Sequence, residues 1–180
     1  MKKMVFGWLG IGVLVLHAPL SASAGESKSP LKVLVEIGKQ KDGATVKLTV
    51  VNDSKTYQLY QGMSCSWQDN WTTDDKHAQI EGTMDCNKNV SITVILAPGE
   101  KYAVPTHPLA LRGTTGKHKL RFGYVRHVST YTSAQLEQLY HSKNQGAEFY
   151  GPSAGQHFKK ATETFWSAPT VVEVSPPSLL

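Results

Sequence analysis

The sequence predicts a mainly β, antiparallel β-sandwich with a partly helical insertion before its last strand. Three observations predict it: short segments of alternating apolar and polar residues, Gly, Pro and Asn turns between them, and one later segment with helical spacing. Alternation buries every second side chain of a half-buried antiparallel strand. About six or seven such strands in about 150 residues are typical of two packed sheets.

The expected strands follow one another along the chain. In Ala44–Val51, apolar Val46, Leu48 and Val50 alternate with polar residues, and Ala97-Pro98-Gly99-Glu100 has the Pro and Gly of a type II turn. The predicted strands are Leu31–Ile37, Ala44–Val51, Thr56–Gln61, Val90–Leu96, Lys117–Val125 and Thr170–Val174. They indicate one domain over residues 31–174, with a mobile leader at 25–30 and a tail at 175–180.

The insertion is the segment Arg126–Ser167, which is much longer than the about two to five residues of a hairpin loop. Thr132-Ser133-Ala134-Gln135 matches a capping box, and Leu136, Leu139 and Tyr140 follow it at helical spacing. We therefore expect a helix there, ending near residues 144–146.

A second short helix is expected to begin near Ser153. Its apolar positions are Phe158, Ala161, Thr162 and Phe165. We expect the large apolar side chains of the insertion either to cover one end of the sandwich or to form a surface for a partner. The aromatic residues selected as candidates for binding are Trp67, Trp71, Tyr140, Phe149, Tyr150 and Trp166.

Residues 1–24 are expected to be a signal peptide. Lys2 and Lys3 precede an apolar run that ends at Leu16, and Ala22-Ser23-Ala24 supplies small residues at a cleavage position. The run is shorter than the about 20 residues that cross a bilayer core as a helix. We expect an exported protein, periplasmic or extracellular, whose mature chain begins at Gly25 and has no stable membrane span.

The charge of the chain does not indicate nucleic-acid binding. The formal charge is +5 at pH 7, and two of the positive charges, Lys2 and Lys3, leave with the signal peptide. Three consecutive basic residues occur nowhere, and aromatic residues are not interleaved with basic ones as they are in a stacking platform. The expected partner is another exported protein or a component of the cell envelope.

Cys65 and Cys86 are the only cysteines, and in an oxidising compartment such a pair usually forms a disulfide. This bond would stabilise the fold by roughly 3 kcal/mol through loop closure. The alternative is a soft Cu(I) site that combines the two thiolates with Met63 and Met84, near His77. Because that site needs reduced cysteines outside the cytoplasm, we expect the disulfide, with no metal and no cofactor.

One motif in the insertion is associated with catalysis. Gly151-Pro152-Ser153-Ala154-Gly155 matches the G-x-S-x-G pattern of a nucleophile elbow, which belongs to a parallel sheet with an acid and then a histidine later in the chain. Here His157, the only later histidine, precedes both Glu163 and Glu173. The order of the triad fails, so we assign no catalytic residue and expect a protein that is not an enzyme.

Several turns and strand ends resemble those of bacterial immunoglobulin-like domains, and the bacterial intracellular proteinase inhibitor family is the nearest. The resemblance rests on Val50-Val51-Asn52-Asp53-Ser54, Leu96-Ala97-Pro98-Gly99-Glu100, Gly116–Tyr124 and Phe165–Val174. It covers about half of the mature chain and implies an immunoglobulin-like sandwich. The export signal, the cysteine pair and the long insertion depart from that family, and no inhibitory residue is carried over.

The sequence thus favours an exported, non-catalytic binding or interaction domain. Two long segments between predicted strands, Gln68–Asp85 and Arg126–Ser167, would carry its contacts. The alternatives are a proteinase inhibitor and, in another class, a small hydrolase or a metal-handling protein.

Overall fold

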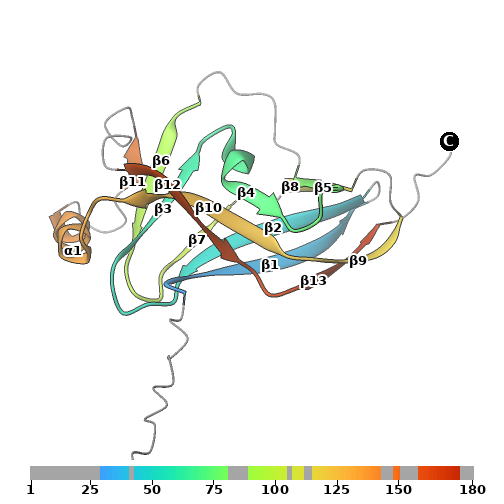
Figure 1. Cartoon of the computed structure of the whole chain (residues 1–180), viewed down its shortest axis with the longest axis horizontal. Helices are drawn as coiled ribbons and strands as arrows, with labels where there is room; N and C mark the ends of the chain where they lie inside the picture. Colours follow the sequence, from blue (N-terminus) through green and yellow to red (C-terminus); the bar gives the residue numbers. More distant parts are fainter. Residues whose placement is uncertain are drawn as a thin grey trace, which may run out of the picture.

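The structure is a computed structural model that describes residues 29–40, 43–80, 89–104, 107–111, 115–142, 148–150 and 158–174. These residues form thirteen strands, one α-helix and one short 3-10 helix (Figure 1). Every strand pair in this part of the chain is antiparallel. The predicted mainly β sandwich with a helix before the last strand is confirmed. The expected signal peptide, most of the leader, the tail, Cys86 and Ser153 lie outside the described residues.

The first layer is built around a long hairpin. Strands β1 (Leu31–Gln40) and β2 (Gly43–Asn52) pair along their whole length. Strands β7 (Lys101–Ala103) and β8 (His107–Leu111) pair with successive parts of β2, and β5 (Ala78–Ile80) pairs with β8. The order in this sheet is β1-β2-β8-β5, with β7 also on β2.

The second layer consists of shorter ladders. Strand β10 (Phe122–Ser129) lies between β12 (Phe158–Trp166) and β4 (Trp71–Thr73), and β6 (Ser91–Leu96) lies between β3 (Gln58–Met63) and β11 (Glu148–Tyr150). Strands β9 (Gly116–Leu120) and β13 (Thr170–Val174) pair with each other and flank the β10–β12 ladder in sequence.

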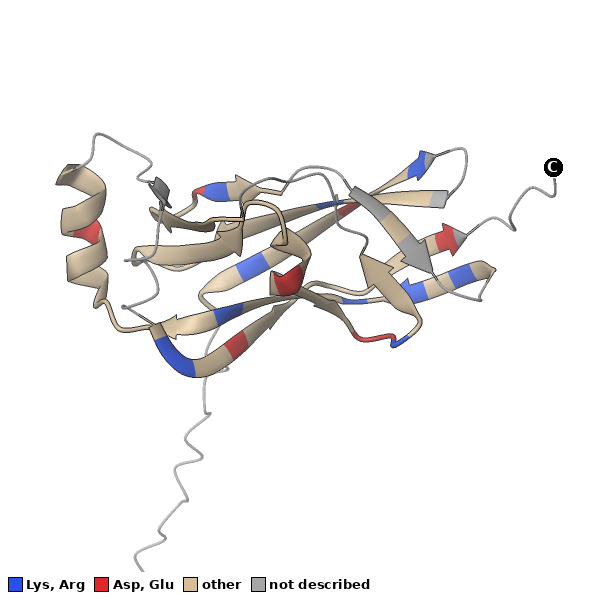
Figure 2. Ribbon diagram, turned by 90° about the horizontal axis from the view of Figure 1, so that it is seen from above, with Lys and Arg blue, Asp and Glu red and all other residues tan. Residues whose placement is uncertain are grey.

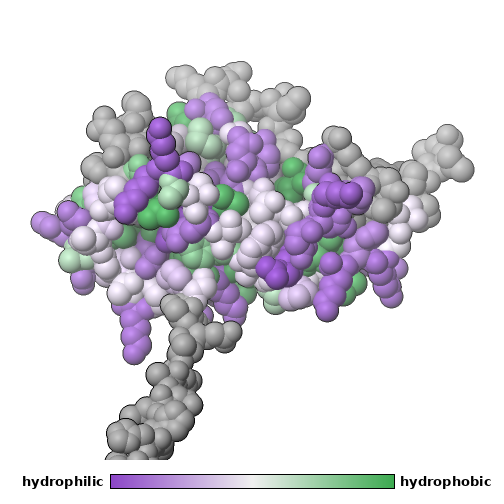
Figure 3. All heavy atoms as spheres, viewed as in Figure 1, coloured by the Kyte–Doolittle hydropathy of each residue, from purple (hydrophilic) through white to green (hydrophobic). Residues whose placement is uncertain are grey.

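The main hydrophobic core lies between the two layers. Val46, Leu48 and Val50 are at most 1% exposed and belong to the same cluster as Phe122 and Tyr124, both fully buried. The predicted inward face of the second strand is therefore confirmed. In the view of Figure 3 the described surface is mostly hydrophilic, with scattered hydrophobic spots between polar residues, and Figure 2 shows the charged residues spread over the strands.

The helix α1 (Ser133–Ser142) covers a second, smaller cluster. Its side chain Leu136 packs with Leu59 of β3 and Ile95 of β6, on the side of these strands that does not face the main core. The predicted capping box is confirmed, because the Gln135 N–H donates to Thr132 Oγ1 (3.3 Å) and the Thr132 N–H donates to Gln135 Oε1 (2.8 Å). Figure 1 shows α1 at the end of the molecule opposite β9 and β13.

The expected second helix is wrong in the part that the structure describes. Residues 158–166 form strand β12, which pairs with β10 from Gly123 opposite Trp166 to Ser129 opposite Phe158. The spacing of its apolar residues fits a helix, but β-branched Thr162 and Thr164 suit a strand and the ladder with β10 satisfies the backbone. Within the segment Arg126–Ser167, residues 126–129, 148–150 and 158–166 are thus strands of the sandwich.

Several predicted boundaries also change. The expected strand Lys117–Val125 is interrupted at Arg121, because the Phe122 N–H donates to the hydroxyl of Ser167 and each half pairs with a different strand. Its second half, β10, continues to Ser129.

The expected strand Thr56–Gln61 begins two residues later, at Gln58, since Thr56 belongs to the preceding turn. The segment Gln68–Asp85, expected as a loop, contains most of a 3-10 helix η1 (Trp67–Asn70) and strands β4 and β5.

Asn52, at the end of β2, joins three parts of the chain. It is 1% exposed, and its amide Nδ2 donates to the carbonyl oxygens of Thr56 and Leu96, both at 2.8 Å. Its Oδ1 accepts hydrogen bonds from the N–H (3.1 Å) and hydroxyl (2.7 Å) of Ser54. Its backbone N–H donates to the carbonyl of Glu100 and its carbonyl accepts the N–H of Gly99, which fixes the turn at residues 97–100. In this turn Gly99 has φ 81°, as a type II turn requires.

Replacing Asn52 should therefore destabilise the fold. We expect Asn52→Ala to lower the free energy of unfolding by about 2–3 kcal/mol, because it leaves the buried carbonyl of Leu96 without its donor and opens the turn at Thr56. Urea unfolding followed by tryptophan fluorescence measures the change. Lys55→Ala, at an exposed position of the same turn, is the control and should change stability by less than about 0.5 kcal/mol. Equal stabilities for the two variants would contradict the role given to Asn52.

Candidate binding surface

A pocket of about 320 Å³ lies where the chain passes from one layer to the other. Its volume is at the lower end of the range of about 300–1,000 Å³ typical of small-ligand sites. It is lined by residues of η1, β4, β5 and the turn between these strands: Gln68, Trp71, Thr72, Thr73, Asp75, Lys76, Ala78, Gln79 and Ile80.

The pocket exists because β4 and β5 pair in different sheets. Strand β4 pairs with β10 of the second layer, whereas β5 pairs with β8 of the first. The turn between them is held by Thr73, whose Oγ1 lies 2.7 Å from the carbonyl oxygen of Asp75 and 3.1 Å from that of Ala78. The carboxylate of Asp75 accepts the N–H of His77 at 2.8 Å. These bonds fix the turn whose polar residues Asp75 and Lys76 line the pocket.

The lining of the pocket is suited to binding a polar group. It presents one carboxylate, Asp75, and one ammonium group, Lys76, together with hydroxyl and amide side chains. The amide oxygen of Gln68 is buried and has no hydrogen-bond partner among the described residues. A buried acceptor without a partner gains free energy when a ligand or water donates to it.

Trp166 lies beside this pocket and is held from two sides. Its indole packs over Gly123, where an added Cβ would lie 2.9 Å from Trp166 Cζ3 and 2.9 Å from Thr72 Cγ2. The Arg121 guanidinium carbon lies 4.8 Å from the centre of the indole ring, and Arg121 Nε lies 3.8 Å from a carboxylate oxygen of Asp74. Thr72 lines the pocket and also lies with Trp166 over Gly123, so the pocket continues into the region of Trp166. We call this surface, which consists of the pocket, Asp74, Arg121 and Trp166, the Trp166 surface.

The structure separates the aromatic residues selected from the sequence. Trp67 and Trp71 are 5% and 7% exposed and belong to the main core, so they support the surface from within. Tyr140 packs against the smaller cluster, and its hydroxyl donates to Glu100 Oε1 at 2.5 Å. Phe149 and Tyr150 pair with β6 through their backbones, and their side chains are not among the described parts of the structure. Trp166, which is 39% exposed, offers an accessible ring.

Cys65 is buried at the end of the strand–helix connection, and its N–H donates to Asn89 Oδ1 at 3.1 Å. The described part of the chain contains no free cysteine. Cys86 and Met84 lie outside it, so the bond between Cys65 and Cys86 stays a prediction. The described residues also contain no group of three or more His, Cys, Asp or Glu side chains placed to hold a metal ion.

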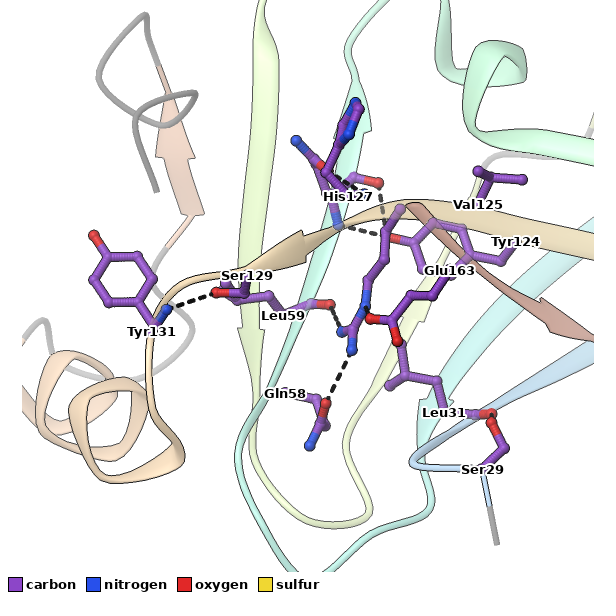
Figure 4. Close-up of polar contacts among 12 residues, drawn as sticks. Ser29, Leu31, Gln58, Leu59, Tyr124, Val125, His127, Ser129, Tyr131 and Glu163 are labelled. Atoms are coloured by element: carbon purple, nitrogen blue, oxygen red, sulfur yellow. Dashed lines mark hydrogen bonds and ion pairs between the residues drawn. The ribbon is translucent and has the colours of Figure 1, made fainter. Parts of the chain in front are cut away.

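A buried polar cluster joins β3 to β10, and sequence reasoning missed it (Figure 4). The Tyr124 hydroxyl donates to the carbonyl of Gln61 (2.8 Å) and accepts its N–H (2.6 Å). Arg126 donates from Nε to Glu163 (2.6 Å) and from Nη1 to the Leu59 carbonyl (2.5 Å). One signal was available in the sequence: Arg126 follows Phe122 and Tyr124 at strand spacing and so belongs to the inward face.

The residue types of this cluster are those of many active sites, but its hydrogen bonds serve the fold. Arg126 is 7% exposed, and its remaining donor Nη2 lies 3.2 Å from Gln58 Oε1. Burial raises the pKa of the Tyr124 hydroxyl well above the ordinary tyrosine value. Burial also raises the pKa of the Tyr60 hydroxyl well above the ordinary tyrosine value. The neighbouring Tyr124, whose ring stacks on that of Tyr60, raises it further. The hydrogen-bonded Tyr124 and the buried Tyr60 both stay neutral and are structural groups.

Comparison with models of known protein families, with curated proteins and with solved structures gives no match for this chain. No helix within the described residues has the length and apolar character needed to cross a membrane.

The two buried tyrosines predict a loss of stability in alkali. The native protein keeps both hydroxyls protonated above pH 10.0, the ordinary tyrosine pKa, whereas the unfolded chain releases both protons. The free energy of unfolding should be constant with respect to these groups below about pH 9 and fall above about pH 10, by up to about 1.4 kcal/mol per pH unit for each tyrosine. Urea unfolding at a series of pH values measures this slope.

Tyr124→Phe should be less stable at neutral pH but have a shallower alkaline slope than the unmodified protein. Phe122→Leu is the matched control, because it weakens the same core without removing a hydroxyl and should lower stability without changing the slope. An unchanged slope in Tyr124→Phe would show that the Tyr124 hydroxyl does not control the alkaline transition.

Proposed function

We propose that this protein is an exported, non-catalytic binding domain that contacts another exported protein or a cell-envelope component through the Trp166 surface. The observation that carries the proposal is an exposed Trp166 stacked under Arg121, next to a polar pocket. Trp and Arg are the residue types most enriched among the side chains that dominate binding energy. The same surface combines an aromatic ring with charged and amide groups, as binding sites for proteins and polar ligands do.

The fixed position of Trp166 supports a binding role. Its ring is held over Gly123 on one side and by the Arg121 guanidinium on the other. A side chain that is already ordered loses little conformational entropy when a partner covers it. Trp166 is therefore suited to act as an anchor.

The buried cluster at Arg126 favours binding over catalysis. Tyr124 and Arg126 are buried and bond to the backbone of β3, and Arg126 also bonds to Glu163, so these two side chains are not available to a substrate. A proteinase inhibitor, which is a special case of a binding domain, would use the same surface against an exported protease. Stoichiometric inhibition in a panel of exported proteases would identify that case.

Export and the disulfide belong to the same proposal and share one measurement. We expect the mass of the exported protein to correspond to residues 25–180, and alkylation under denaturing, non-reducing conditions to leave that mass unchanged. After reduction, two alkyl groups should be added, one at Cys65 and one at Cys86. A full-length mass would contradict cleavage after Ala24, and alkylation before reduction would contradict the disulfide.

Truncating Trp166 should weaken capture of the partner. Immobilised protein is incubated with envelope extract, and the proteins retained by the unmodified chain are identified and then measured individually. We expect Trp166→Ala to weaken binding by about tenfold or more, as loss of an anchor does. Lys76 is an exposed residue of the pocket lining. Lys76→Glu should weaken binding of the same partner without disturbing the packing of the Trp166 indole.

The matched control is Val171→Ala. Val171 is the other large hydrophobic residue that is exposed in the described part of the chain, at 59%, and it lies outside the Trp166 surface. Thermal unfolding checks that both variants are folded. Equal binding by Trp166→Ala and Val171→Ala would overturn the proposed surface.

A further inference from the structure

We propose that the free edge of β1 pairs with β1 of a second copy of this chain, in an antiparallel register centred on Leu34. The two copies would then form a symmetric dimer with a sheet that continues from one to the other. The arrangement has the twofold symmetry of most homodimers. It does not depend on the function proposed for the Trp166 surface.

The first observation is the length and position of the strand. β1 has ten residues and stands at the end of its sheet (Figure 1). Among the described residues its backbone ladder is with β2 alone, and it also lies close to β12 and β10 of the second layer. Strands are more often about five or six residues long, and a long edge strand leaves a row of backbone N–H and C=O groups directed outward. Such an edge serves as a template for another strand.

The second observation is the pattern of side chains along this edge. Leu31 and Val33 are buried on the inner side, and Val35 and Ile37 continue that side as partly buried residues packed against the core. On the outer side Lys32 and Glu36 are exposed, with Leu34 between them partly buried. The outer side therefore reads as a positive, an apolar and a negative residue at equal spacing.

This pattern is complementary to itself in one antiparallel register. With Leu34 opposite Leu34 of the second copy, Lys32 lies opposite Glu36 of that copy, and the pair occurs twice. On the inner side, Val33 then lies opposite Val35 and Leu31 opposite Ile37. Cross-strand pairs of opposite charge and of apolar residues both stabilise a sheet.

Neighbouring registers lose the complementarity. A centre at Val33 places Lys32 opposite Leu34, and a centre at Val35 places Leu34 opposite Glu36. Both arrangements put a charge against an apolar side chain, so the charges select the register centred on Leu34. A strand from another protein would need no such twofold pattern, and for this reason the proposed occupant is a second copy.

The charged groups are accessible for this contact. The Glu36 side chain is 68% exposed, and its contact within the chain is an exposed ion pair with Lys47 of β2, at 3.3 Å. Because Lys47 approaches from the β2 side, the outer edge of Glu36 is open to Lys32 of the second copy. A surface ion pair of this kind holds the carboxylate only weakly.

Two charge-reversal variants test the proposal without depending on stability. In Lys32→Glu alone, two glutamates face each other at both contacts, and in Glu36→Lys alone, two lysines do. When the two variants are mixed, each contact again joins a glutamate to a lysine. Sedimentation equilibrium over about three decades of protein concentration measures the dimer dissociation constant.

We expect the unmodified protein to dimerise, each variant alone to dissociate about tenfold or more readily, and the mixture to recover dimers. Lys39→Glu makes the same change of charge on the same strand but lies opposite Ser29 in this register, so it should dimerise normally. A monomeric unmodified protein at every concentration would overturn the proposal, as would a mixture that dissociates as readily as each variant alone.

Discussion

The second layer of this sandwich depends on one joint between strands that share no backbone ladder. β3 belongs to the ladder with β6 and β11, and β10 belongs to the ladder with β12 and β4. The Tyr124 hydroxyl closes the gap, because it both donates to and accepts from the backbone of Gln61, as an opposite strand residue would. Arg126 adds a bond to the Leu59 carbonyl in the next pair of residues. Without these bonds the N–H and carbonyl of Gln61 and the carbonyl of Leu59 would lose these partners, and a buried backbone group without a partner costs about 1–3 kcal/mol.

This joint also determines where the Trp166 surface lies. The side chains of Phe122, Tyr124 and Arg126 all face inward, so Gly123 between them must face outward. Since glycine has no side chain, the indole of Trp166 and the methyl group of Thr72 can lie close to the backbone there. The exposed ring and the polar pocket therefore depend on the buried cluster behind them, and a change that displaces β10 would move both.

Local patterns predicted the parts of the fold that local interactions determine. The alternation of Val46, Leu48 and Val50, the capping box at Thr132 and the turn at Gly99 were all predictable because each pattern consists of residues a few positions apart in the sequence. Strand β12 was not, because Phe158, Ala161 and Phe165 have helical spacing and the pairing with the distant strand β10 overrides it. The same limit applies to Arg126, whose burial is compensated by Glu163 and the Leu59 carbonyl, each more than thirty residues away.

The aromatic residues show a related limit. Trp67, Trp71 and Trp166 all lie near turns, and composition alone does not distinguish an anchor for a partner from a core residue. The backbone pairing makes the distinction. Trp71 lies opposite Tyr124 and so shares its inward face, whereas Trp166 lies opposite Gly123 and shares its outward face. Since facing residues of an antiparallel pair project to the same side of the sheet, the register of β10 alone places one tryptophan in the core and the other on the surface.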